Sequence, residues 1–194
     1  MIGIIGAMGV EIQSLVQMLE NRETVTLSGI EYAKGTIHNR EVVLAVCGIG
    51  KVFAAVCAQT MILKFAPDVI INTGVAGTLT ESLTIGDIAV SENVAQHDMD
   101  TTALGDPAGF LSGINIIKIP ADGKTRQLLV DCIKQLGVNY RTGTICSGDQ
   151  FLASQEVKDR IVKNFGAIAG EMEGGAIGQV CFINNVKFCV LRAI

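Results

Sequence analysis

Short apolar runs, many of them followed by glycine, alternate along this chain with segments in which apolar residues recur at helical spacing. This alternation is typical of an α/β domain, in which buried strands are joined by helices that cover the sheet. We expect strands at residues 2–6, 30–37, 41–47, 68–73, 86–91, 140–146, 167–171 and 187–193. The helical spacing predicts four helices, at residues 51–65, 125–136, 156–164 and 175–182. The stretch from Asp98 to Gly113 has no clear periodicity and is interpreted as a functional loop.

The length and composition of the chain favour one compact domain over residues 1–194. Hydrophobic residues make up 49% of the chain, which has 22 glycines, only 3 prolines and no internal repeat or linker. The mean hydropathy is +0.44, but no uninterrupted apolar run reaches the roughly 18 to 20 residues that a membrane-spanning helix needs. Residues 1–8 lack a basic leader and are interpreted as a buried strand, not as a signal peptide. We therefore expect a soluble, cytoplasmic protein with no membrane partner.

Charge and cysteine spacing narrow the class of protein further. The net charge is −4 at pH 7, and no cluster of Lys or Arg offers the electrostatic footprint that a polyanion requires, so nucleic acid is not an expected partner. The six cysteines contain no Cys-x-x-Cys pair, and most of them lie in apolar segments. They are interpreted as reduced core residues of a cytosolic protein, at positions Cys47, Cys57, Cys132, Cys146, Cys181 and Cys189.

Four glycine-rich turns, at residues 6–9, 47–51, 72–77 and 147–151, follow predicted strands. Open α/β sheets bind ligands at such strand ends, so we expect these turns to meet the segment Glu171-Met172-Glu173 at one crevice. In that segment two carboxylates flank a methionine where an apolar strand turns into a helix of small residues. Glu173 can accept two hydrogen bonds from vicinal hydroxyls. The alternative is that Glu171 and Glu173 only cap the helix.

Two phosphate-binding motifs are excluded by their spacing. Residues 48–51 resemble the end of a P-loop, but Ala45 and Val52 occupy the positions that require glycine and Ser or Thr. The glycines of residues 3–9 follow a three-residue spacing that differs from the dinucleotide-binding fingerprint. No nucleotide cofactor is therefore expected.

Three other polar or aromatic positions have two interpretations each. His97, Asp98 and Asp100 resemble metal ligands, but His38 is the only other histidine, so a polar loop anchor is favoured and no metal is expected. Ser147 lies outside a G-x-S-x-G elbow, which argues against a Ser-His hydrolase. Phe151, directly after a glycine turn, either lies flat against a planar ligand such as a nucleobase or packs in the core.

Taken together, these segments resemble the 5′-methylthioadenosine/S-adenosylhomocysteine nucleosidases of the nucleoside phosphorylase-like family. The resemblance covers the whole chain in colinear order, and it implies a phosphorylase/hydrolase-like fold. That fold is a three-layer α/β sandwich around a central mixed, twisted sheet. The segments that carry the resemblance are residues 3–8, 48–52, 68–74, 86–88, 97–98, 147–149, 171–173 and 192–194.

The resemblance implies hydrolysis of the N-glycosidic bond of 5′-thio-substituted adenosines to adenine and a thioribose, without metal or cofactor. By resemblance, Glu11 orients and deprotonates the water, and Glu173 holds the ribose hydroxyls. Met172 would pack on the sugar, Phe151 would stack on adenine, and the backbone of Leu152 would read the purine edge. Further substrate contacts are implied at Ala7, Met8, Ile49, Ala76, Gly77 and Arg192. The expected partners are a small adenine nucleoside and, in a homodimer, a second copy of the chain.

Two other functions remain open on the sequence. Phosphorolysis is disfavoured because residues 72–80 and the first turn contain no Arg or Lys, and the Glu11 carboxylate would repel phosphate. The family motif continues past Arg192-Ala193-Ile194 into Ser-Asp, whose aspartate protonates adenine N7, and a C-terminal helix follows. Because the sequence stops at Ile194, we expect this acid and helix to be missing, and the alternative is a non-catalytic nucleoside-binding remnant. Val75 also stands where the family commonly has a hydroxyl residue.

Overall fold

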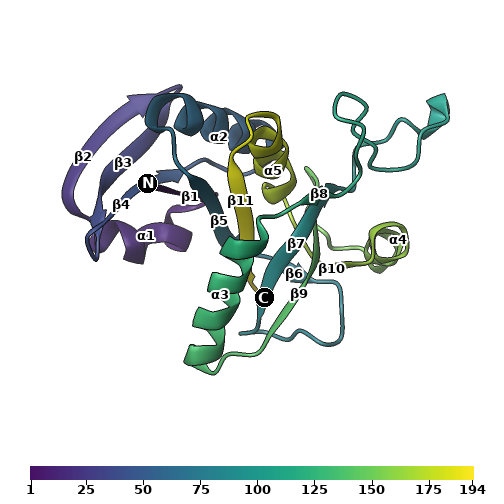
Figure 1. The fold of residues 1–194 in the computed structure, drawn as a ribbon. Coiled ribbons are helices and arrows are strands. Elements are labelled where there is room, and N and C mark those ends of the chain that lie inside the picture. The colour runs from purple at the N-terminus through teal and green to yellow at the C-terminus, as the bar shows by residue number, and fades with distance from the viewer.

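The computed structural model describes all residues, 1–194, as one α/β unit built on a single sheet (Figure 1). The strands are β1 (Ile2–Gly6), β2 (Glu20–Leu27), β3 (Ile30–Ile37), β4 (Arg40–Val46), β5 (Val69–Val75), β6 (Gly77–Thr78), β7 (Ile88–Gln96), β8 (Ile119–Pro120), β9 (Tyr140–Ser147), β10 (Ala167–Glu171) and β11 (Lys187–Ala193). The helices are α1 (Gly9–Gln17), α2 (Lys51–Phe65), α3 (Gly123–Leu136), α4 (Gln155–Phe165) and α5 (Gly174–Ile183), with a 3-10 turn at Thr102–Leu104.

The sheet is mixed and has the order β2-β3-β4-β1-β5-β11-β7-β9-β10-β6, with β8 paired to β7. Its centre is parallel from β4 through β1 and β5 to β11, and again from β7 through β9 to β10. These two parallel halves meet in the antiparallel pair of β11 and β7. The predicted α/β fold with a mixed sheet is therefore confirmed.

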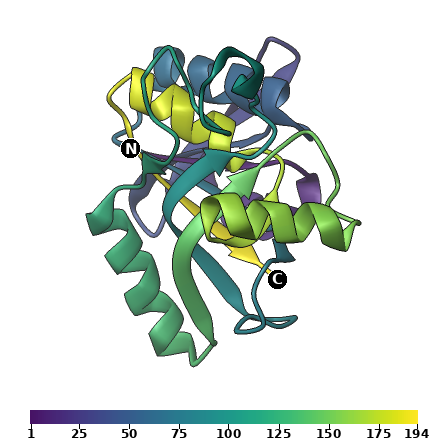
Figure 2. The same cartoon turned by 90° about the vertical axis from the view of Figure 1, so that its right-hand side faces the viewer.

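Side chains alternate between the two faces of the sheet, and each face has its own layer of helices (Figures 1 and 2). In β4, Val43 belongs to the core cluster that contains α2 and α5, whereas Leu44 packs with Ile12 of α1. In β11, Val190 belongs to the α2 and α5 face, whereas Cys189 packs with α3. The helix α4 covers the same face as α3, over β9 and β10. This arrangement is the predicted three-layer sandwich.

The helix α5 lies very close to the sheet because its residues are small. A side chain at Gly175 would come within 2.9 Å of Gln96 and Ser147, and one at Gly178 would come within 2.6 Å of Val94. All residues from Gly174 to Gly178 are buried. This close packing fixes the start of the helix directly beside the ends of β7 and β9.

Several details differ from the sequence expectation, and the short strands β6 and β8 are among them. The structure has a fifth helix, α1, and an additional edge strand, β2, and the strand expected at residues 86–91 extends as β7 to Gln96. Five of the first six residues of β2 are exposed, and they show no alternation of apolar and polar residues. This edge strand buries few of its side chains against the rest of the protein. The 98–113 stretch is mostly irregular and holds the 3-10 turn at Thr102–Leu104 and Leu111, which forms an isolated bridge with Ile116. Of the six free cysteines, five are buried as expected, but Cys132 is exposed on α3.

None of the helices combines the length and the apolar character that crossing a membrane would require.

Candidate active site

The glycine-rich turns after β1, β4, β5 and β9 meet the end of β10 at a pocket of about 440 Å³. Every predicted site residue except Arg192 lines this pocket, namely Ala7, Met8, Glu11, Ile49, Ala76, Gly77, Phe151, Leu152, Met172 and Glu173. Val75, Gln150, Gly170 and Glu171 complete its lining. A second hollow of about 500 Å³ lies between α1 and the strands β3 and β4, but its only ionisable groups are Arg22 and Glu31, which pair with each other. The pocket that contains the carboxylates is therefore the candidate active site.

Glu11 stands in the first turn of α1, where the helix dipole favours an acidic side chain. One carboxylate oxygen, Oε2, accepts hydrogen bonds from the backbone N–H of Ala7 at 2.7 Å and of Met8 at 2.9 Å. The other, Oε1, accepts from the N–H of Val75 at 3.0 Å. Because all three donors are backbone groups of two neighbouring strand ends, the fold itself fixes the position of this carboxylate.

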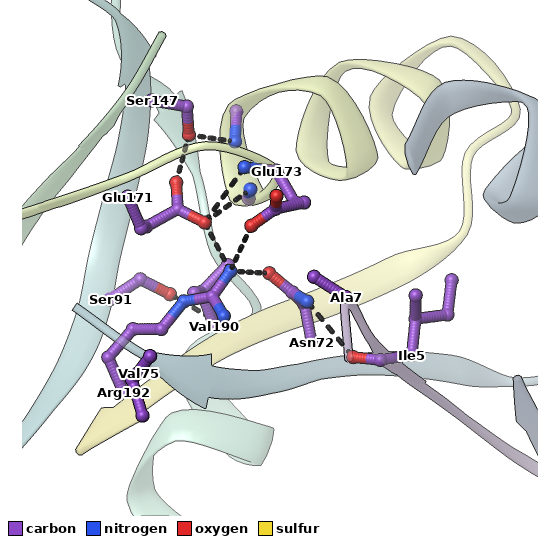
Figure 3. Close-up of polar contacts among 12 residues, drawn as sticks. Ile5, Ala7, Asn72, Val75, Ser91, Ser147, Glu171, Glu173, Val190 and Arg192 are labelled. Atoms are coloured by element: carbon purple, nitrogen blue, oxygen red, sulfur yellow. Dashed lines mark hydrogen bonds and ion pairs between the residues drawn. The ribbon is translucent and has the colours of Figure 1, made fainter. Parts of the chain in front are cut away.

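Arg192, on β11, is fully buried behind the pocket (Figure 3). Its Nη2 donates to Asn72 Oδ1 and to Glu171, and it lies 3.6 Å from Glu173 Oε2. Asn72 is itself held by a hydrogen bond of 2.9 Å from its Nδ2 to the carbonyl oxygen of Ile5. This network anchors one end of the guanidinium between β1, β5 and β10.

The Nη1 atom of Arg192 has no hydrogen-bond partner, although it is buried. A methyl group at Gly74 would overlap both this nitrogen and Oε1 of Glu11. Gly74 therefore lets Nη1 of Arg192 and the Glu11 carboxylate lie against the backbone of β5, where any side chain would clash with both.

Glu171 caps the helix α5. Its Oε2 accepts from the backbone N–H of Glu173 at 3.0 Å and of Gly174 at 2.8 Å, and its Oε1 accepts from the hydroxyl of Ser147. Ser147 also accepts a hydrogen bond of 2.5 Å from the N–H of Gly175. The capping interpretation thus holds for Glu171, and Ser147 is engaged in the same cap.

Glu173 does not cap the helix with its side chain. Its Oε1 accepts a hydrogen bond of 2.9 Å from the N–H of Gly50, which belongs to the turn before α2. The residue is 4% exposed. Burial raises the pKa of Glu173, and the charge of Glu171 adds to this effect, while the Gly50 N–H and Arg192 oppose it. The side chain therefore presents a hydrogen-bond acceptor in a largely dry part of the pocket.

The raised pKa of Glu173 makes stability depend on pH. A carboxyl with a raised pKa binds its proton more tightly in the folded protein than in the unfolded chain. The stability that this proton contributes is lost as the pH rises from 4.5, the ordinary pKa of the group, through the raised pKa. Glu173→Gln removes this loss and keeps an oxygen for the Gly50 N–H. We expect the melting temperature of the variant, relative to the parent, to increase between about pH 4 and about pH 7. The exposed Glu20→Gln serves as control, and an equal difference at both pH values would contradict the assignment.

The aromatic and apolar residues line the outer part of the pocket. Phe151 is 88% exposed, so the core-packing interpretation of this residue is wrong. Met8 and Ile49 are also exposed, at 36% and 56%, and they lie in the turns after β1 and β4. These side chains can cover an apolar or planar ligand at little cost because they are already partly in water.

Several residues of the site had no predicted role. Gly50, Asn72, Gly74 and Ser147 lie in the segments that the sequence singles out, but each acts through a partner far away in the chain. Of these residues, Asn72 could most easily have been recognised from the sequence. A polar residue inside a predicted apolar strand is expected to be buried and hydrogen-bonded.

Comparison with known proteins decides the family. The model of the phosphorylase superfamily matches residues 1–194. A 5′-methylthioadenosine/S-adenosylhomocysteine nucleosidase of Shewanella halifaxensis is 41% identical over 195 residues, which cover 100% of this chain and 84% of the relative. The chain belongs to this nucleosidase family of the phosphorylase superfamily.

Solved structures of the family agree with the fold. A mutant of the Helicobacter pylori nucleosidase with 5′-methylthioadenosine in its active site is 37% identical, with a TM-score of 0.95 over 100% of this chain and 84% of that one. The Neisseria meningitidis nucleosidase in complex with methylthio-immucillin-A is 36% identical, with a TM-score of 0.95 over 99% and 84%. A futalosine hydrolase of Helicobacter pylori is also similar, at 36% identity and a TM-score of 0.95 over 100% and 83%.

Proposed function

We propose that this member of the nucleosidase family hydrolyses the N-glycosidic bond of 5′-methylthioadenosine and S-adenosylhomocysteine, and releases adenine and the 5′-thioribose. The observation that carries the proposal is the placement of two carboxylates, Glu11 and Glu173, from different elements in one pocket. Cleavage of this bond builds positive charge on the sugar, which fixed carboxylates stabilise and to which an activated water adds.

Glu11 is the proposed base for the attacking water. A water in the pocket would donate a hydrogen bond to the Glu11 carboxylate, which lines the pocket. The carboxylate would orient this water and take its proton as the water adds to the sugar. Val75 contributes only its backbone N–H to Glu11, so the hydroxyl that relatives commonly carry at this position is not needed to hold the carboxylate.

Glu173 is the proposed acceptor for the ribose hydroxyls, since its Oε2 has no hydrogen-bond donor and its nearest cation, Arg192, is 3.6 Å away. Met172 would pack on the sugar, and the exposed ring of Phe151 would stack on adenine beside the Leu152 backbone. The remaining contacts are assigned to the apolar wall that would receive the thioether, at Ala7, Met8, Ile49, Ala76 and Gly77.

Water is favoured over phosphate as the nucleophile. No Lys or Arg lines the pocket, whereas Glu11, Glu171 and Glu173 do. A phosphate dianion would be repelled by these carboxylates without a compensating cation at the pocket surface.

The test is adenine release by the purified protein from 5′-methylthioadenosine and S-adenosylhomocysteine, with and without phosphate. We expect release that does not depend on phosphate. Phosphate-dependent release would identify a phosphorylase instead. Tight nucleoside binding without any release would identify a binding protein without turnover. Futalosine is assayed as a second candidate substrate, because a solved structure similar to this chain is a futalosine hydrolase.

The homodimer remains a prediction, and exposed apolar residues of one helical layer support it. Val52 of α2 is 74% exposed and Ile183 of α5 is 57% exposed, and both helices lie on the same face of the sheet (Figure 2). Val52 is followed along α2 by Phe53, 58% exposed, and Val56, 39% exposed, and neighbouring exposed apolar side chains of this kind favour an interface. Val52→Glu should weaken self-association about 100-fold, because an unpaired charge would be buried. Sedimentation velocity measures this effect. Leu128→Glu, 67% exposed on the opposite face, is the control, and equal behaviour of both variants would contradict the assigned face.

A further inference from the structure

A closed ring of hydrogen bonds joins three segments beside the pocket. The Nζ of Lys51, the first residue of α2, donates to Asp98 Oδ1 at 2.7 Å. The other oxygen of Asp98 accepts from the backbone N–H of Asp149 at 2.9 Å. Asp149 Oδ1 in turn accepts from the backbone N–H of Lys51 at 2.8 Å. The ring thereby ties the start of α2 to the loops that follow β7 and β9.

The Lys51–Asp98 ion pair of the ring is largely shielded from water, and this shielding strengthens the attraction between the two charges. The side chains of Lys51 and Asp98 are 19% and 20% exposed, and the Lys51 ammonium also donates to Gln96 at 3.2 Å. Burial acts to raise the pKa of Asp98, but the hydrogen bonds from Lys51 and Asp149, with the Lys51 charge, outweigh it and hold that pKa below its ordinary value. Asp98 therefore stays ionised at neutral pH and keeps its pairing with Lys51.

The loop after β9 packs closely on the loop after β7 beside this ring. A methyl group at Gly148 would overlap the imidazole of His97 and come within 3.1 Å of Asp98. The backbone N–H of His97 also donates a hydrogen bond of 2.9 Å to the backbone carbonyl oxygen of Ser147. The two loops are thus held in contact at the backbone, and the ring has one favoured geometry.

The residue directly before Lys51 carries the donor that holds Glu173. Gly50 has a φ of 100°, a conformation that other residues rarely adopt, and its N–H donates to Glu173 Oε1 at 2.9 Å. No other hydrogen-bond donor reaches this side chain from within the chain, since Arg192 lies 3.6 Å from its Oε2. A displacement of the α2 start would therefore move the one group that orients the carboxylate.

We propose that Lys51, Asp98 and Asp149 are positioning residues that fix the Gly50 N–H and, through it, the orientation of Glu173 toward the ribose hydroxyls. This inference rests on the proposed function, which makes Glu173 the ribose acceptor. The ring acts only through Glu173, so its contribution to riboside binding should vanish when the Glu173 carboxylate is absent.

A double-mutant cycle tests this dependence. Calorimetry measures the affinities of the parent, Lys51→Met, Glu173→Ala and the double variant for 5′-methylthioadenosine and for free adenine. Lys51→Met removes the ammonium but keeps the backbone N–H that Asp149 accepts. We expect it to weaken riboside binding about tenfold in the parent and less than about twofold in the Glu173→Ala background, since coupled residues are non-additive. Adenine affinity should stay unchanged in Lys51→Met.

The control is Lys64→Met, an exposed lysine in the last turn of the same helix, which should leave both affinities unchanged. If Lys51→Met fails to fold, Asp98→Asn takes its place, because it keeps the shape and the acceptor for the Asp149 N–H. Equal losses in both backgrounds, or no loss in the parent background, would overturn the positioning role alone. If Glu173→Ala weakens the binding of adenine as much as the binding of the riboside, Glu173 is not the ribose acceptor of the proposed function. The positioning role of the ring is then overturned as well.

Discussion

Replacing Glu11 by glutamine is expected to lower adenine release by about 10²- to 10⁴-fold, while riboside affinity stays within about threefold. The amide keeps the shape of the side chain but cannot take a proton from water. Glu11 lines the pocket from the first turn of α1, so its substitution removes the proposed base and leaves the Glu173 side of the site intact. The measurement is single-turnover adenine release together with calorimetric binding of 5′-methylthioadenosine.

The same substitution should also carry a stability cost. Both oxygens of Glu11 accept backbone N–H groups, so the new amide nitrogen must face at least one donor. The lower cost arises if the amide nitrogen faces Val75, because a single N–H donor then loses its acceptor, and this cost should amount to about 1–3 kcal/mol. The exposed Glu156→Gln in the first turn of α4 is the control for both effects. Near-parental turnover in Glu11→Gln would show that another group activates the water.

The strands and glycine turns could be predicted because they depend on local pattern. The central strands β5 and β11 contain short apolar runs, at residues 69–71 and 188–191, whose side chains are buried or half-buried. The turns after β4 need glycine at Gly48 and Gly50, whose φ angles are positive. These features need no knowledge of the partner strand.

The helix α1 and the strand β2 could not be predicted for physical reasons. The helix α1 begins at Gly9 with Val10, two poor helix formers, and of its residues only Ile12 is buried. It is held by Ile12, by the half-buried Leu15 and Val16 that pack with it, and by the hydrogen bonds of Glu11. The strand β2 pairs with β3 at the edge of the sheet, so backbone hydrogen bonds define it more than any apolar periodicity.

The candidate site was predictable as a set of segments but not as a set of contacts. Glu173 meets a donor 123 residues away at Gly50, and Arg192 meets Asn72 from 120 residues away. The Arg192–Asn72 pair follows from the sheet order, in which β11 lies next to β5, and the Gly50–Glu173 pair follows from the packing of α2 beside α5. No local pattern encodes that order, which is why the role of Arg192 behind the pocket emerges only from the fold.

Arg192→Met should be the most destabilising single change in the site, with a loss of about 3–5 kcal/mol in the free energy of unfolding. Arg192 is the cation that lies beside two nearly buried carboxylates, Glu171 and Glu173, which are 7% and 4% exposed. Methionine fills similar space but leaves these charges without a counter-ion in a region of low dielectric constant. Because a typical domain is stable by only about 5–15 kcal/mol, the variant should be close to unfolding at neutral pH.

Two measurements distinguish the loss of the counter-ion from the loss of side-chain volume as the cause of the destabilisation in Arg192→Met. Carboxyls without a cation have raised pKa values, so the deficit of Arg192→Met should shrink as the pH falls through those raised values toward the ordinary value of 4.5. Adding Glu171→Gln and Glu173→Gln to the variant should recover more than half of the deficit at pH 7, since no buried charge then remains. Urea unfolding followed by circular dichroism measures each step. Arg22→Met, which breaks the exposed 3.0 Å pair with Glu31, is the matched control and should cost less than about 1 kcal/mol. A similarly small cost for Arg192→Met would mean that water reaches the carboxylates, and the dry character assigned to the Glu173 side of the pocket would then be wrong.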